Sequence, residues 1–479
     1  MKLKLQEFFA KKENLYLVLA LTFGLIMALF NPPFAGVPDE HAHYWKAWSI
    51  AEGYWKCTGQ DAIPESAQKL PDQIKPVAYE GIKDKKIVLA KLKEKLGQKD
   101  TNKNAVIGGA VCTATPFGYF AQSIGLRFGK LFNLSALADF YLARIANLIL
   151  VVILIFFAIK IIPFGKTILL IIALFPLTIQ QASSLSYDAP QIGFAFLFFA
   201  YILRLTVEKE KQIRKKDIVI LFALSLFGLN IKLGYFVLSL LVLLIPKEKF
   251  KSVKNYFIFI LTFLISNVAL FFLDRRLYLE LKAPDWTNPA EQLKFVMSSP
   301  FHFLNVLFET LYQSNLVTYV TGVIYRPGWG ASTSHILLIC IFVGIILFVK
   351  NEEESVPLTK RQRWIIMTVF ILNFILIYLA LYLGWTTVGA SKISGVQGRY
   401  LIPLLPLFII FFYKASFNLQ YKFIKKHLNL LLLISLVTVF VFVVWDAYNS
   451  YYNKAGANPV PASVGVAPVS EAIQSSSSE

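Results

Sequence analysis

Two adjacent acidic residues, Asp39 and Glu40, follow the first long apolar run of the chain, in the sequence PDEHAH. A carboxylate at the point where a chain leaves a membrane faces reactants that lie in the lipid headgroup region. The competing interpretation is a helix N-cap at Asp39, followed by a second acid that the helix dipole favours. His41 and His43 add potential proton carriers or metal ligands, although PDEHAH alone is not a metal-binding motif.

A third acid, Asp188, lies in the sequence SLSYDAPQ between two apolar runs, in a short turn without basic neighbours. An acid this close to hydrocarbon is costly, so we expect it to face a cavity or a charged partner. A helix N-cap with Pro190 in the first turn is the alternative interpretation. The two roles are compatible.

Basic residues are scarce in the short connections that we expect on the same side of the membrane as Asp39 and Asp188. Lys232 separates two apolar runs, Arg399 lies in GVQGRYLIPLLP, and Arg144 lies inside YLARIANLI. A cation at this depth costs roughly 2 to 3 kcal/mol unless it reaches the interface or meets an anion. Snorkelling explains each residue singly, but convergence of the three on one face predicts a site for a lipid phosphate. Arg326 and Trp329, in the turn YRPGWG, would also be useful beside a ligand.

The amino-acid composition indicates whether lipid or water surrounds the helices that position these residues. Of 479 residues, 56% are hydrophobic, 16% are charged and 42 are Phe, with a mean hydropathy of +0.57. A soluble protein could not cover this much apolar surface. About eleven runs approach the roughly 20 residues that cross a bilayer, near residues 14–30, 139–161, 166–183, 189–206, 217–230, 233–246, 254–273, 334–349, 363–383, 400–413 and 428–445.

The sequence therefore predicts an all-α polytopic membrane protein. The runs on either side of Asn230-Ile231-Lys232 read as a hairpin, because only then do all the short basic connections fall on one side, as the positive-inside rule requires. This places the N-terminus in the cytoplasm and the C-terminus outside. Membrane topology also explains the net charge of +19, so no nucleic acid is expected, and the first run is expected to be an uncleaved span.

Two connections, 31–138 and 274–333, are unusually long and lie outside in this topology. We expect both to carry amphipathic helices along the membrane surface, with Trp45 and Trp48 at the interface. Residues 58–105 read as a solvated insertion, and 453–479 as a disordered tail after a transmembrane domain of residues 1–452. Cys57 and Cys112 could form a disulfide or remain two unrelated thiols.

Three short motifs, in their order and spacing, suggest a family. PDEHAH after the first span, SYD after the third and GVQGRYLIPLLP near the end resemble the bacterial membrane family catalogued as domain of unknown function 2142. That family looks like a branch of the GT-C glycosyltransferases, whose first and fourth outer loops are long and whose first loop begins with an acidic motif. The likeness covers residues 15–445, but the insertion at 58–105 has no counterpart that we can match.

The resemblance implies transfer of a sugar from a polyprenyl-phosphate donor to a hydroxyl of a cell-surface glycan, glycolipid or protein, on the outer face of the bacterial cytoplasmic membrane. Asp39 then looks like the general base of an inverting single displacement, with Glu40 as its substitute. No cofactor is required, and a divalent metal is optional. Donor and phosphate binding would involve Lys232, Arg399, Arg326, Arg144, Asp188, Tyr187, Gln397 and Tyr400, with His41, His43 and Trp329 supporting the acceptor side.

Two other classes of membrane protein stay open from the sequence. A transporter or flippase for lipid-linked sugars needs many spans and a few intramembrane charges, but two large outer loops are not an obvious requirement, and no inverted repeat is visible. A polymerase or ligase of lipid-linked glycans would use similar chemistry with an oligosaccharide donor. The sequence does not encode the sugar, the acceptor or the length of the lipid.

Overall fold

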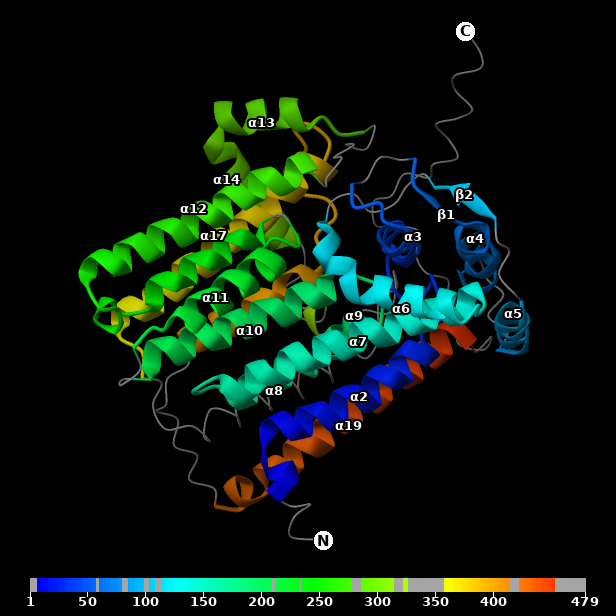
Figure 1. The fold of residues 1–479 in the computed structure, drawn as a ribbon, viewed down its shortest axis with the longest axis horizontal. Helices are drawn as coiled ribbons and strands as arrows, with labels where there is room; N and C mark the ends of the chain where they lie inside the picture. The colour runs from blue at the N-terminus through cyan, green and yellow to red at the C-terminus, as the bar shows by residue number, and fades with distance from the viewer. Residues whose placement is uncertain are drawn as a thin grey trace.

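The computed structural model describes residues 7–56, 60–79, 85–98, 103–107, 114–208, 212–232, 234–277, 286–313, 322–325, 357–412 and 422–452. In this part of the chain, long helices run roughly alongside one another, and the smaller elements α3 to α6, β1 and β2 gather near one end of them (Figure 1). The long helices hold the apolar core, and the smaller elements come from the first of the two long connections.

Five helices are long and apolar enough to cross a membrane: α2 (Lys12–Phe30), α7 (Ala136–Ile161), α10 (Asp188–Val207), most of α12 (Val253–Leu277) and α17 (Lys360–Trp385). Three shorter apolar helices span Tyr235–Leu244, Gly398–Phe412 and Leu433–Asn449. The last lies within α19 (Lys422–Tyr452), and Gly398–Phe412 comprises η5 (Gly398–Leu404) and α18 (Leu405–Phe412). The described residues thus contain fewer spanning helices than the eleven expected.

Broken helices account for part of this difference. The run at 166–183 divides into α8 (Lys166–Ala173) and α9 (Pro176–Ala182), because Pro176 cannot continue the hydrogen-bond ladder of α8. The run at 217–230 begins as α11 (Lys215–Leu224) and ends in the π-helical turn η2 (Ser225–Leu229). The run at 334–349 lies outside the described residues.

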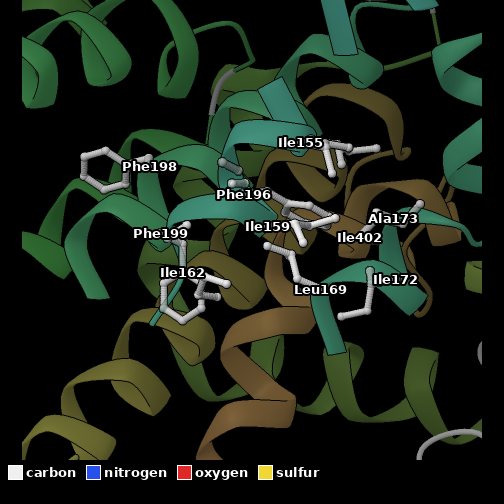
Figure 2. Close-up of a cluster of buried hydrophobic side chains, with 14 of the residues drawn as sticks. Ile155, Ile159, Ile162, Leu169, Ile172, Ala173, Phe196, Phe198, Phe199 and Ile402 are labelled. Carbon is white, nitrogen blue, oxygen red and sulfur yellow. The ribbon is translucent and has the colours of Figure 1, made fainter. Parts of the chain in front are cut away.

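Helix α10 is at the centre of the apolar core. Its phenylalanines share one apolar cluster with side chains from α7, α8 and η5. In Figure 2, Phe196 and Phe199 lie near Ile159 and Ile162, whereas Phe198 points to another side of α10, where its ring stacks with that of Phe263. A helix that is apolar around most of its circumference is buried on most sides. Two candidate site residues are attached to this core, because Asp188 is the first residue of α10 and Arg399 is the second residue of η5.

The hairpin predicted around Lys232 is confirmed. The backbone N–H of Ile213, before α11, donates to the carbonyl of Lys249 at 2.9 Å. Lys249 ends η4 (Lys247–Lys249), which follows η3 (Tyr235–Leu244). Because the two ends of the segment meet, the chain runs out through α11 and returns through η3, and Lys232 lies at the tip.

The first long connection is folded over its described residues, and the insertion at 58–105, which was expected to be solvated, buries part of its surface while much of the rest is exposed. It contains α3 (Glu40–Ala51), α4 (Glu65–Tyr79), α5 (Lys85–Gly97), η1 (Pro116–Tyr119) and α6 (Phe120–Leu131). Strands β1 (Ala62–Pro64) and β2 (Asn104–Val106) pair antiparallel. Leu70, Ile74 and Val88 are buried in a core that also buries Trp48, because the insertion covers α3. Trp48 is therefore not an interfacial residue.

The second long connection carries the two expected helices, α13 (Pro289–Ser298) and α14 (Pro300–Gln313). Phe303 and Leu307 of α14 pack against Tyr378 and Tyr382 near the end of α17. The opposite face of α14, with Phe301, is exposed. Leu304 and Phe308 are exposed as well, so both faces of α14 carry apolar residues. The two helices are confirmed, but a single apolar face on α14 is not.

Candidate functional site

Asp39 does not cap helix α3. Its backbone is in the left-handed region, with φ of +59°, and its side chain accepts no capping hydrogen bond. The carboxylate is 47% exposed, whereas a capping carboxylate turns toward the backbone N–H groups of the first helical turn. The N-cap interpretation of Asp39 is therefore wrong, and the carboxylate points to a place where a ligand could meet it.

Glu40 is fully buried and forms a two-pronged ion pair with Arg144 of α7. The Arg144 Nε and Nη2 atoms lie 2.9 Å and 2.6 Å from the two carboxylate oxygens, and Nη1 donates to the carbonyls of Ala28 and Asn31. Backbone N–H groups of Phe34 and Leu185 also donate to Glu40. This placement argues against Glu40 as a substitute base and removes Arg144 from the candidate phosphate ligands.

Asp188 brings together the two other cations. Its carboxylate oxygens lie 3.2 Å from the Lys232 Nζ and 2.8 Å from the Arg399 Nε, and its side chain is 5% exposed. The three residues come from the start of α10, the hairpin tip and the start of η5. The expectation that Asp188 meets a charged partner is confirmed, and the convergence expected of the basic residues holds for two of the three.

Arg399 connects this group to Asp39, because its Nη2 lies 3.9 Å from an Asp39 carboxylate oxygen. A close backbone approach fixes its position: a Cβ on Gly398 would clash with the carbonyl of Gly322. Gly395, with φ of +78°, lies in the irregular segment that precedes η5. We call Asp39, Asp188, Lys232 and Arg399 the outer cluster, because the positive-inside rule predicts that they lie on the extracytoplasmic side.

Aromatic rings cover the cations of the outer cluster. The Lys232 Nζ lies 3.4 Å from the centroid of the Tyr400 ring and 5.4 Å from that of Tyr187. The Tyr235 hydroxyl donates to the Tyr400 carbonyl at 2.7 Å, which anchors that residue. Gln397 is half-buried directly before η5. Tyr187 and Tyr400 thus lie next to the outer cluster.

His43 and Tyr119 form a buried pair next to the outer cluster. The His43 Nδ1 lies 2.8 Å from the Tyr119 hydroxyl, and both rings contact the ring of Tyr187. Burial and the nearby Arg399 and Lys232 cations lower the pKa of His43 to about 3, so the imidazole is neutral. Sequence reasoning missed Tyr119, because FGYF carries no pattern that separates it from an ordinary core aromatic.

Another predicted site residue, His41, lies close enough to His43 to affect its charge, and further predicted residues lie outside the described chain. His41 is half-buried with its ring 5.4 Å from that of Trp45, whereas Arg326, Trp329, Cys57 and Cys112 are not among the described residues. Within the described ranges, no three His, Cys, Asp or Glu side chains are grouped so that they could hold a metal ion.

The outer cluster combines the half-exposed Asp39 carboxylate with the Lys232 and Arg399 cations. Its formal charges cancel, since Asp39 and Asp188 are balanced by Lys232 and Arg399. An ammonium group has three N–H donors and a guanidinium five, so both cations keep donors for an added anion after they bind Asp188. The arrangement can hold a phosphate beside a carboxylate that is able to accept a proton.

Comparison with known proteins gives one match. The profile of a family described as predicted membrane protein (DUF2142) matches residues 21–408. Neither the curated proteins nor the solved structures contain a match to the chain. The matched range includes every residue of the outer cluster.

Proposed function

The chain belongs to the DUF2142 family of predicted membrane proteins, and we propose that it is a membrane glycosyltransferase. It transfers a sugar from a polyprenyl-phosphate donor to a hydroxyl of an extracytoplasmic glycan, glycolipid or protein. The observation that carries the proposal is the half-exposed Asp39 carboxylate, which lies 3.9 Å from an arginine that also binds the buried Asp188. Inner-membrane location, an outward-facing site and GT-C-like architecture are parts of the same proposal.

The proposed reaction is a single displacement. The Asp39 carboxylate accepts the proton of the acceptor hydroxyl as its oxygen bonds to the anomeric carbon, and the bond from that carbon to the phosphate oxygen breaks. Attack from the side opposite the phosphate inverts the configuration. The lipid phosphate leaves with one additional negative charge, which Lys232 and Arg399 stabilise. Because Asp39 becomes neutral at the same time, the total charge of the site does not change.

Asp188 has a positioning role in this proposal. A lysine and an arginine near the membrane would repel each other and turn toward water, and the buried carboxylate between them holds both in place. The Tyr400 ring beneath the Lys232 ammonium adds a cation–π contact. The phosphate would therefore meet cations that are already oriented, so little reorganisation is needed.

The test is transfer of radiolabelled sugar from a panel of polyprenyl-phosphate monosaccharides to native membrane acceptors. Asp39→Asn suits it, because asparagine tolerates the left-handed backbone that Asp39 adopts. We expect this variant to lose about 100-fold or more of the transfer rate, while Asp72→Asn, at an exposed acid of α4, stays at the wild-type rate. Normal turnover by Asp39→Asn would exclude the assignment.

A flippase for lipid-linked sugars is the second candidate, and one feature favours it. Helices α8 and α9 are two halves of a broken apolar run, and broken helices often line transport pathways. Quenching of a fluorescent lipid-linked sugar in proteoliposomes would distinguish the two. Movement across the bilayer without sugar transfer from any donor would favour the flippase.

A further inference from the structure

Trp286 and Trp385 form an exposed pair of tryptophans. Trp385 directly precedes the loop that leads to Arg399. The two ring centroids are 5.5 Å apart and the rings are nearly perpendicular, at 83°. The side chains are 54% and 48% exposed. Trp385 is the last residue of α17, and Trp286 precedes α13 in the second long connection, so two distant segments contribute to the pair.

The loop after α17 is held firmly at several points. The N–H of Gly389 donates to the buried Gln292 of α13 at 2.9 Å, and the N–H of Ile393 donates to Thr310 of α14 at 3.0 Å. Within the loop, the Ser394 N–H donates to the Thr386 hydroxyl at 3.1 Å. The second long connection therefore fixes the loop that leads into η5.

The Trp385 ring packs directly against Gly395, where an added Cβ would clash with the indole. Gly395 is four residues before Arg399, which lies 3.9 Å from Asp39. Trp385 and Arg399 therefore lie on one short segment of the chain, through which the tryptophan pair is connected to the outer cluster. This connection distinguishes the pair from aromatic residues elsewhere at the ends of spans.

The surroundings of the pair favour an aqueous ligand over lipid. The loop that follows Trp385 exposes Thr387, Ser391, Lys392 and Ser394, with Val388 as an exposed apolar residue among them, and Asn288 is exposed two residues after Trp286. An indole face carries partial negative charge and attracts the partially positive C–H groups of an apolar surface. A pyranose ring has such a C–H face together with hydroxyls that hydrogen-bond to polar neighbours, so it fits this surface better than an acyl chain.

We propose that Trp286 and Trp385 form a platform that binds a sugar ring of the acceptor, so that the acceptor is a glycan. This inference rests on the proposed function and specifies its acceptor class. The platform would hold a sugar residue of the acceptor while another hydroxyl of the same glycan reaches Asp39. Such a contact raises affinity for the acceptor without changing donor binding.

The kinetic test separates acceptor binding from loop structure. We expect Trp286→Ala and Trp385→Ala each to raise the acceptor KM about tenfold, with the donor KM unchanged, and Trp385→Phe to have a smaller effect. Trp364→Ala is the matched control, because Trp364 is 56% exposed at the other end of α17 and also pairs with an aromatic ring. If Trp385→Ala changed the donor KM and Trp286→Ala changed neither KM, Trp385 would have a merely structural role. This result would overturn the platform.

A binding test does not require transfer. Full-length protein in nanodiscs is titrated with gluco-, galacto-, manno- and rhamno-configured tetrasaccharides, and tryptophan fluorescence is recorded. We expect a change with at least one of them, lost in Trp286→Phe/Trp385→Phe and retained in Trp364→Phe. No fluorescence change with any tetrasaccharide would overturn the platform and leave the proposed transfer standing. Normal sugar transfer by Asp39→Asn would instead exclude the proposed transfer and leave the binding site standing.

Discussion

Asp39 and Glu40 are consecutive in the chain, yet their carboxylates lie in opposite environments. The Asp39 side chain is 47% exposed beside Arg399, and Glu40 is fully buried in a two-pronged pair with Arg144. The left-handed backbone at Asp39 turns the chain between them. One acid is thus available to a ligand, and the other ties α3 to α7. This difference leads to separate expectations for the two residues.

Removing the charge of Glu40 should affect stability. Glu40→Gln leaves the Arg144 guanidinium buried without its anion, which typically costs about 3 to 5 kcal/mol. We expect a markedly lower thermal unfolding temperature in detergent for Glu40→Gln, and a change within about 0.5 kcal/mol for Asp39→Asn, whose side chain is half-exposed. Equal stability of the two variants would show that the buried pair does not hold α3 in place.

Removing the cations of the outer cluster should weaken donor binding. Lys232→Met and Arg399→Met each remove a charge-assisted contact to the phosphate, and we expect the donor KM to rise about tenfold or more. Lys392→Met is the control, because Lys392 is exposed in the loop that carries Arg399. A donor KM that changes equally in all three variants would point to general electrostatic attraction in place of a defined phosphate site.

The neutral state of His43 should make the protein less stable in acid. Burial and neighbouring cations lower the pKa of this imidazole from 6.5 to about 3, so between these pH values the unfolded chain binds a proton that the folded chain does not. Stability is therefore complete above about pH 6.5 and decreases as the pH falls toward 3, by at most about 1.4 kcal/mol per pH unit.

The His43 contribution can be isolated by comparing melting temperatures of wild type and His43→Gln between pH 7 and pH 5. We expect the wild type to lose more stability than the variant over this range, since the variant has no imidazole to protonate at this position. Parallel curves would mean that His43 titrates near its ordinary pKa and is more accessible than its packing against Tyr119 indicates.

A methyl group at Gly398 should disturb the site. Gly398→Ala forces its Cβ against the Gly322 backbone, which moves η5 and Arg399, whereas Gly384→Ala adds a methyl in open space on α17. We expect transfer to fall at least about tenfold in Gly398→Ala and to stay normal in Gly384→Ala. Full activity of Gly398→Ala would show that the position of Arg399 does not depend on this close approach.

The sequence by itself indicated that the protein lies in a lipid bilayer and which of its residues could bind a phosphate. Apolar runs and basic connections indicated spanning helices, and the hairpin around Lys232 followed from charge alone. Local spacing also predicted α3, α13 and α14, because an amphipathic period is a property of consecutive residues. Asp188 was expected to have a charged partner because an isolated charge near hydrocarbon is unstable.

Only the tertiary structure decided which charges pair. Arg144 and Arg399 looked equivalent in the sequence, yet one binds Glu40 and the other lies between Asp188 and Asp39. The Gly398 approach to Gly322 and the Trp286 contact with Trp385 likewise join segments that are far apart in the chain. An ion pair or ring contact depends on distances of a few ångströms between side chains, and those are set by the packing of whole helices, which no local pattern encodes.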